Sequence, residues 1–267
     1  MAPGLFATDP SEPLDVLVRD APDAPAPGGA RVQRFELTSR GDRVPGRLLL
    51  PPDRGGPHPV VLLQHGAGGS KDAAYLDAAA GPWVKGGAAV ACIDLPLHGE
   101  RASAKLSERV LGELAAAHAG VRSSDLWVEF VRQSVCDLRR TLDALASHPE
   151  LDGGRCAFAG FSLGTILGAS FCGVDPRPRA AALAIGGGGF GPPEVDPVAY
   201  IGRFAPRPVL FVNASRDERI PRAASEALFA AAGEPKQIAW FESGHSDLPG
   251  AALKAMWLFL RPHLGLA

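Results

Sequence analysis

Short, continuous apolar runs alternate along the chain with longer stretches whose apolar residues recur every three or four positions. The short runs predict strands that are buried on both faces, and the longer stretches predict helices that cover them. The predicted strands lie at residues 59–66, 88–96, 155–160, 179–187, 207–214 and 237–242. The predicted helices lie at residues 71–87, 105–118, 123–147, directly after 162, at 221–232 and at 250–262. This alternation predicts an α/β fold with a mostly parallel sheet and helices on both faces.

The N-terminal part of the chain has a different pattern. Residues 31–39 and 44–52 alternate apolar with polar side chains, which predicts a half-exposed antiparallel pair at one edge of the sheet. Residues 1–30 are dense in Pro, Asp, Ala and Gly, which disfavours regular structure and predicts an arm that lies on the domain or stays mobile. We therefore expect one α/β domain over residues 31–267, preceded by this arm.

Composition and charge narrow the choice of partners. The chain has 267 residues, of which 46% are hydrophobic and 21% charged, with a formal net charge of -2. It lacks a basic field that would favour nucleic acid or an anionic membrane, so a small neutral or acidic molecule is the expected partner.

No apolar run approaches the roughly 18 residues of a membrane span, and the N-terminus lacks the pattern of a signal peptide, so we expect a cytoplasmic protein. The four cysteines form no C-x-x-C pair and are expected to be buried free thiols. The sequence does not predict the oligomeric state.

The stretch G-F-S-L-G at residues 160–164 places Ser162 between two glycines, after a predicted strand and before a helical stretch. Because 32 of the 267 residues are glycine, this pattern alone would arise by chance in about one such chain in five. The strand-to-helix context makes it more specific, since a sharp turn there exposes the serine hydroxyl beside the N–H groups of a helix N-terminus. A serine that only caps the helix fits the same residues.

A serine hydroxyl becomes a nucleophile only when a base takes its proton. His245 lies in the loop after the last predicted strand, where the loops of such a sheet converge on ligands. A carboxylate must then orient the imidazole, and Asp217, in the loop after strand 207–214, is preferred, with Glu218 in reserve. An incidental loop histidine remains the alternative for His245.

Acyl transfer also needs N–H donors for the oxygen that becomes negative. One would be the amide of Leu163, the residue after the serine, and the glycine-rich turn H-G-A-G-G supplies Ala67 as the second. The turn lacks the G-x-x-x-x-G-K-[ST] pattern of a phosphate loop, so a nucleotide site is not expected. His65 is then expected to hold the turn by hydrogen bonds.

The stretches "HGAGGS", "IDLPLHGER", "GFSLGT", "SRDERIP" and "SGH" occur in the order seen in α/β-hydrolases. From about residue 32 onward the chain resembles this family, and is most similar to its dienelactone-hydrolase-like and prolyl-oligopeptidase-like esterases. The resemblance implies a triad of Ser162, Asp217 and His245 with oxyanion donors at Ala67 and Leu163, and neither a cofactor nor a metal. It implies a pocket-lining or structural role for Asp94 and His98, as for His65. Two features depart from these relatives: dienelactone hydrolase itself uses a cysteine nucleophile, and residues 1–30 are too few to form the propeller domain of an oligopeptidase.

The expected activity is that of a serine hydrolase that cleaves carboxylic esters through an acyl-enzyme. A peptidase or a thioesterase would use the same triad, and a cofactor-free haloperoxidase side activity also fits it. An inactive fold that only binds a small molecule is the alternative outside the enzymes. Residues 99–122 exceed the length of an ordinary connection and form either a short lid over the pocket or a surface helix.

The rate should depend on pH if a histidine is the base. Activity is expected to rise with pH through about 6 to 7, where an ordinary histidine loses its proton. A pH profile of kcat/KM on a simple ester measures this, and a rate that does not change across the range would count against His245.

Overall fold

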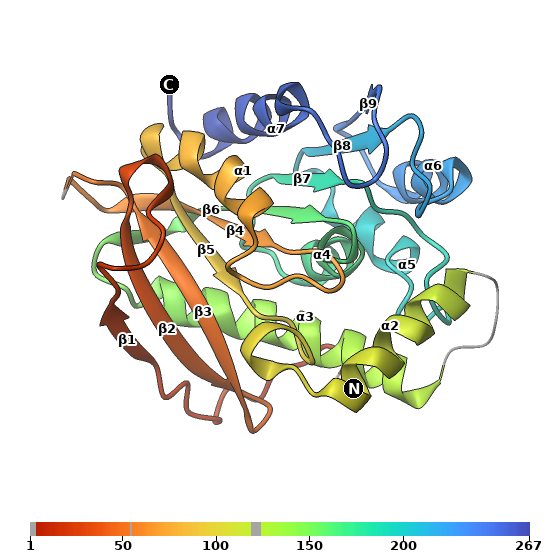
Figure 1. Ribbon diagram of the computed structural model, residues 1–267, viewed down its shortest axis with the longest axis horizontal. Coiled ribbons are helices and arrows are strands. Elements are labelled where there is room, and N and C mark those ends of the chain that lie inside the picture. Colours follow the sequence, from red (N-terminus) through yellow and green to blue (C-terminus); the bar gives the residue numbers. More distant parts are fainter. Residues whose placement is uncertain (1–3, 54, 119–123) are drawn as a thin grey trace.

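The computed structural model describes residues 4–53, 55–118 and 124–267. Nine strands form one sheet in the order β1-β2-β3-β5-β4-β6-β7-β8-β9 (Figure 1). The strands are β1 (Leu17–Asp20), β2 (Arg31–Ser39), β3 (Asp42–Leu50), β4 (His58–Gln64), β5 (Ala89–Ile93), β6 (Leu151–Phe161), β7 (Ala181–Ala184), β8 (Val209–Ala214) and β9 (Lys236–Phe241). The helices are α1 (Ala74–Lys85), α2 (Ala104–His118), α3 (Asp125–Ala146), α4 (Leu163–Val174), α5 (Val198–Ile201), α6 (Arg222–Ala231) and α7 (Gly250–His263), and the 3-10 turns are η1 (Pro27–Gly29), η2 (Gly99–Arg101) and η3 (Gly202–Phe204).

The sheet is parallel from β5 through β4, β6, β7 and β8 to β9. The three N-terminal strands β1, β2 and β3 are antiparallel to their neighbours and form one edge. This arrangement confirms the fold class predicted from the sequence. The hydrophobic runs of β4 and β5 were predicted as buried on both faces, and every residue of these two strands is buried.

Two hydrophobic cores lie on the opposite faces of the sheet, because successive strand residues point to opposite sides. In β4, Val60 and Leu62 pack into the core under α2 to α6, while Val61 and Leu63 pack under α1 and α7. Figure 1 shows α1 and α7 together on one side of the sheet and α3 and α4 on the other. The apolar stripe predicted for the helix at 123–147 is confirmed by seven buried residues of α3: Trp127, Phe130, Val131, Val135, Leu138, Leu142 and Leu145.

The N-terminal arm lies on the domain over its described residues. Phe6 is buried and packs edge-on against the ring of Tyr200, with 5.0 Å between the ring centroids. The guanidinium of Arg140 donates a hydrogen bond to the carbonyl oxygen of Glu12 at 2.6 Å. The arm also contains a short strand, β1, which the composition did not predict. In the part of the chain that the structure describes, no helix is long and apolar enough to cross a membrane.

The close approach of α4 to the sheet depends on a residue without a side chain. A Cβ added at Gly168 would lie 2.0 Å from a ring atom of Phe158, which is fully buried in β6. Gly112 in α2 is the opposite case, since a Cβ there would meet nothing within 4 Å.

We predict that Gly168→Ala lowers the free energy of unfolding by about 1 to 3 kcal/mol, because overpacking outweighs the better helix propensity of alanine. Gly112→Ala is the matched control and should leave stability unchanged or raise it by up to about 1 kcal/mol. Urea unfolding of the two variants measures both changes. Equal stability of Gly168→Ala and the native protein would show that α4 is not packed this closely.

Candidate active site

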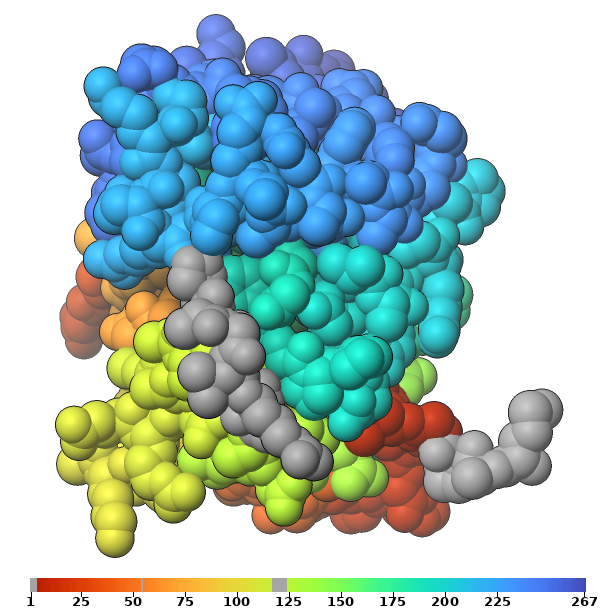
Figure 2. Space-filling view, turned by 90° about the vertical axis from the view of Figure 1, so that its right-hand side faces the viewer, coloured from red at the N-terminus to blue at the C-terminus, as the bar shows by residue number. Residues whose placement is uncertain are grey.

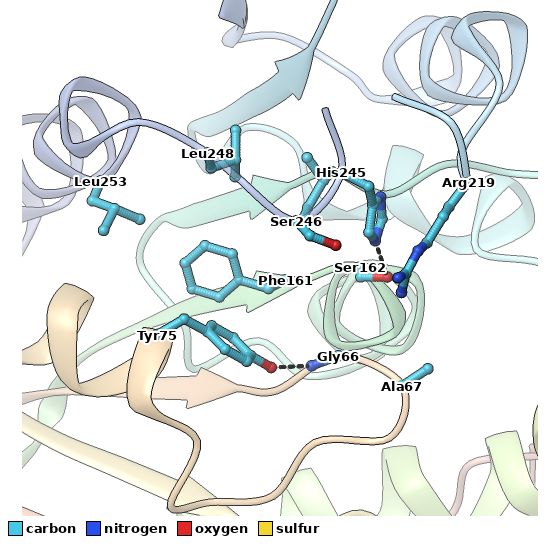
Figure 3. A pocket seen from close by; sticks show the side chains of 11 residues that line it. Gly66, Ala67, Tyr75, Phe161, Ser162, Arg219, His245, Ser246, Leu248 and Leu253 are labelled. Carbon is cyan, nitrogen blue, oxygen red and sulfur yellow. Dashed lines mark hydrogen bonds between the residues drawn. The ribbon is translucent and has the colours of Figure 1, made fainter. Parts of the chain in front are cut away.

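A cavity of about 210 Å³ lies at the carboxyl ends of the central strands. The loops after β4, β6, β7, β8 and β9 converge there, as expected at this edge of a parallel sheet. Figure 3 shows side chains from these loops around one hydroxyl group, that of Ser162. The described residues that line the cavity are Gly66, Ala67, Tyr75, Phe161, Ser162, Ile185, Arg219, His245, Ser246, Leu248 and Leu253.

Ser162 occupies a sharp turn between β6 and α4. Its backbone has φ 54° and ψ -116°, a conformation that is uncommon for any residue other than glycine. A Cβ at Gly160 would lie 2.6 Å from the carbonyl oxygen of Gly164, and a Cβ at Gly164 would lie 2.5 Å from that of Gln64. The two glycines flanking Ser162 are therefore required by the close approach of backbone to backbone, as the motif predicted.

The hydroxyl group of Ser162 does not cap the helix that follows it. It lies 2.9 Å from Nε2 of His245, and Nδ1 of the same ring lies 2.9 Å from each carboxylate oxygen of Asp217. Because an ionised carboxylate only accepts hydrogen bonds, Nδ1 carries the proton and Nε2 is free to accept from the serine. The three side chains thus form one hydrogen-bonded chain that ends at the cavity (Figure 3).

Asp217 is held in place by the backbone of its own loop. One of its oxygens accepts the amides of Arg219 at 2.9 Å and Ile220 at 2.8 Å. Burial by itself would raise the pKa of Asp217, but the hydrogen bond from His245 and those two amides outweigh it and lower the pKa below its ordinary value. The carboxylate is therefore ionised at neutral pH and keeps the imidazole oriented.

The two other carboxylates near the histidine have different partners. Glu218 accepts the backbone N–H of His245 at 2.9 Å, and Asp247 accepts that of Gly244 at 2.6 Å. Both shape the loop that carries His245. Glu218 was the alternative to Asp217 as the carboxylate that orients the imidazole. In the structure it accepts a hydrogen bond from the backbone of His245 and none from its ring.

The two residues whose amides are expected to stabilise an oxyanion are Leu163, which follows Ser162 in the chain, and Ala67, which lines the same cavity. Leu163 is the first residue of α4, and the first N–H groups of a helix have no partner within it. Ala67 lines the cavity, whereas the amide of the preceding Gly66 donates to the hydroxyl of Tyr75 at 2.8 Å. The Tyr75 bond fixes the glycine-rich turn against α1. The oxyanion role of Ala67 and Leu163 stays a prediction.

His65 bridges two loops beneath the site. Its Nδ1 donates to the carbonyl oxygen of Gly66 at 2.8 Å, and its Nε2 accepts the backbone N–H of Leu95 at 3.2 Å. Burial lowers the pKa of His65 to about 4, so this ring is neutral at physiological pH. Burial also lowers the pKa of His98, whose Nδ1 lies 2.8 Å from the carbonyl oxygen of Pro96.

Asp94 forms a buried ion pair away from the cavity. Its two carboxylate oxygens accept the backbone N–H and the ammonium group of Lys71, each at 2.7 Å. The ammonium group also reaches Glu100 at 2.5 Å. None of His65, Asp94 and His98 is among the described residues that line the cavity, so their contacts are structural.

The segment from 99 to 122 contains η2 and α2. Figure 2 shows α2 in yellow-green at the surface, and its one buried apolar residue among those whose burial is described is Val110, which belongs to the core shared with α3. No described residue of this segment, nor of 187–205, lines the cavity. Residues 119–123 lie outside the described part of the chain, so the lid stays a prediction.

Several cavity residues escaped the sequence analysis. Tyr75, Phe161 and Leu253 form an apolar wall together with Ile185 and Leu248, and Tyr75 packs edge-on against Phe161 with 5.5 Å between ring centroids. These residues come from separate parts of the chain, and the sequence marks Tyr75, Ile185 and Leu253 only as core. The positions of Phe161, directly before Ser162, and of Arg219, two residues after Asp217, were available signals for cavity residues.

The cysteines lie apart from the cavity residues. All four cysteines are buried and unpaired, as predicted, and burial raises the pKa of Cys92 to about 12. Over residues 4–53, 55–118 and 124–267, no group of three or more His, Cys, Asp or Glu side chains could hold a metal ion.

Comparison with known proteins gives matches among solved structures. No protein-family model and no curated protein matches the sequence. A cold-adapted esterase from an Arctic intertidal metagenomic library is 24% identical, over 86% of this chain and 93% of its own, with a TM-score of 0.70. An acetyl xylan esterase from Paenibacillus sp. R4 is 19% identical, over 94% and 89%, with a TM-score of 0.75. The α/β hydrolase GrgF from Penicillium sp. sh18 is 14% identical, over 88% and 99%, with a TM-score of 0.69.

The strand order, the turn at Ser162 and these matches show that the chain has the α/β-hydrolase fold. This confirms the fold expected from the resemblance.

The buried histidine under the site should make stability depend on pH. The ordinary pKa of histidine is about 6.5 in the unfolded chain, whereas burial lowers the pKa of His65 to about 4 in the folded protein. Between these values the unfolded state binds more protons, so the free energy of unfolding falls as the pH decreases from 6.5 toward 4. The full loss attributable to this ring is on the order of 3 kcal/mol.

We predict that His65→Gln flattens this dependence, because an amide can still donate and accept but does not titrate. Urea unfolding at several pH values between 7 and 4.5 measures the slope for both proteins, since other groups titrate equally in each. Identical slopes in the variant and the native protein would show that His65 is not buried in its neutral form.

Proposed function

We propose that this protein is a serine hydrolase that cleaves carboxylic esters of small molecules through an acyl-enzyme. The observation that carries the proposal is the hydrogen-bonded chain from Asp217 through His245 to Ser162, with each link at 2.9 Å. The serine sits in a turn that exposes its hydroxyl to a cavity beside a helix N-terminus. Such a chain is suited to remove the serine proton while a bond to carbon forms.

In the first half of the reaction, Ser162 Oγ attacks the ester carbonyl while its proton passes to Nε2 of His245. The negative charge that develops on the carbonyl oxygen is stabilised by the amides of Ala67 and Leu163. The tetrahedral intermediate collapses, the bond to the alcohol oxygen breaks, and the histidine returns the proton to the departing alcohol. Asp217 stays ionised throughout and stabilises the imidazolium.

In the second half, a water molecule takes the place of the alcohol. His245 accepts a proton from the water as its oxygen attacks the acyl carbon. The second intermediate collapses, the bond to Ser162 breaks, and the histidine gives its proton back to the serine oxygen. The carboxylic acid leaves. The atoms and charges of the two half-reactions balance with water as the co-substrate, so the reaction needs no oxidant, metal or cofactor.

Two observations favour esters over the related substrates that the same triad can process. The structural matches reported above include two esterases, which supports ester cleavage at the level of the fold. The cavity is also small and lined mainly by apolar side chains, which suits a compact ester better than an extended peptide.

Removal of the nucleophile or of its base should abolish turnover. We predict that Ser162→Ala and His245→Ala each lower kcat on a short-chain aryl ester by about 10³-fold or more, and that Asp217→Asn does so by a comparable factor because it favours the wrong tautomer. Ser215→Ala is the control, since this serine is exposed in a nearby loop and pairs with Glu242. Initial rates with folded variants, checked by circular dichroism, measure the effect.

The pattern of results separates the alternatives. Turnover that survives in Ser162→Ala would contradict the proposed nucleophile. If the native protein cleaves thioesters or amides much faster than matched oxygen esters, its substrates are thioesters or amides and the proposed ester specificity is wrong. Binding of small esters with a rise in melting temperature and without turnover would identify an inactive binding protein.

A further inference from the structure

Arg219 is the cationic side chain of the cavity. Among the described residues that line it, Arg219 alone carries a permanent charge, and the others are His245 and residues that are apolar or carry a neutral polar group. The guanidinium group extends toward Ser162 in Figure 3, from the side opposite to Leu253. The cavity therefore has an apolar end and a cationic end, with the serine hydroxyl between them.

The structure fixes the position of Arg219 while leaving its guanidinium group exposed. The backbone N–H of Arg219 donates to Asp217 at 2.9 Å, so the residue is anchored to the triad itself. Among the residues that the structure describes, the ion pair of its side chain joins Nε to Glu218 at the long distance of 3.8 Å. Glu218 is already engaged by the amide of His245, and the Arg219 side chain is 63% exposed. A pair of this kind at the surface holds the guanidinium group only weakly.

An arginine so placed is suited to a planar anion. Its terminal nitrogens can donate two parallel hydrogen bonds to a carboxylate, a geometry that a single point charge does not offer. The apolar end of the cavity would penalise the same carboxylate, because an anion there would lose its hydration without gaining a partner. The two ends therefore favour one orientation of a substrate that has both an apolar and an anionic part.

We propose that Arg219 binds a carboxylate of the substrate, so that the enzyme prefers esters that carry a free carboxylate on one side and an apolar group on the other. This inference rests on the proposed ester hydrolysis. It makes Arg219 a specificity-determining residue that touches the substrate and takes no part in proton transfer. The carboxylate lies on the acyl or on the alcohol side of the ester, according to which part occupies the apolar end.

Two matched pairs of esters test the preference. The acyl-side pair is monomethyl adipate and the methyl ester of adipic monoamide. The alcohol-side pair is 4-acetoxybenzoate and 4-acetoxybenzamide. Within each pair, one compound has a carboxylate where the other has an uncharged amide of nearly the same shape. The measured quantity is the ratio of kcat/KM for the anionic ester to that for the neutral ester, determined by pH-stat titration at low ionic strength.

The expected ratio in the native protein, corrected for the spontaneous rates, is about ten in at least one pair, since a charge-assisted contact at an exposed group is screened by water. The ratio should fall to about one in Arg219→Gln and decrease as salt is added. Arg216→Gln is the matched control, because Arg216 lies in the same loop, is exposed, pairs with Glu242 at 3.1 Å and does not line the cavity. The control should keep the native ratio, and melting curves of both variants establish that they are folded.

Three outcomes would overturn the proposal. The first is a native ratio near one in both pairs. The second is a preference that Arg219→Gln retains. The third is an equal loss of kcat/KM on the anionic and the neutral ester in Arg219→Gln, which would place Arg219 at the oxyanion and not at a substrate carboxylate. Turnover of the neutral esters by the native protein tests the proposed hydrolysis separately, so the failure of one proposal is distinguishable from the failure of the other.

Discussion

The contact between the backbone at Gly164 and the end of β4 is the constraint on which the site depends. Because a single residue separates β6 from α4, the chain must reverse at Ser162 with a positive φ, which costs about 1 to 3 kcal/mol in a residue with a side chain. The hydroxyl of Thr165 supports the turn: it lies 2.8 Å from the carbonyl oxygen of Gly160 and 2.7 Å from that of Ala184, and its one proton can be donated to either. The strain aims the Ser162 hydroxyl away from its own helix and toward the imidazole.

Exclusion of water determines which side chains near the site are neutral and which are charged. His65 is buried and neutral beneath the glycine-rich turn, so it can hold that turn without placing a charge under the oxyanion position. The side chain of Asp217 is only 7% exposed, but it keeps its charge because three N–H groups replace the water it has lost. Lys71 and Asp94 neutralise each other in a separate buried pair. Among the described residues, the charged side chains closest to the reacting groups are therefore Asp217, which orients His245, and Arg219, whose guanidinium group is exposed.

Much of this arrangement could be predicted from the sequence, for physical reasons. Most of the buried strands were visible because strands covered on both faces need continuous apolar runs. Ser162 follows β6 directly, and Asp217 and His245 lie in the loops after β8 and β9. The strand β9 was wrongly predicted as buried, because it lies at the edge of the sheet and its side chains are partly exposed. The strand β1 was missed because its four side chains are exposed and it is held by backbone pairing with β2, which leaves no pattern. The cavity wall was also missed, because the meeting of Tyr75 with Phe161 depends on how α1 packs on the sheet.

The central claim is that Ser162 is a nucleophile activated by its neighbours, and a small fluorophosphonate tests it most directly. This reagent reacts rapidly only with a serine whose proton is taken by a base and whose oxyanion is stabilised. Intact-mass measurement followed by peptide mapping should find one adduct per chain, on the peptide that contains Ser162 and not on the one that contains the neighbouring cavity residue Ser246. An unmodified protein, or an adduct at another serine, would contradict the account.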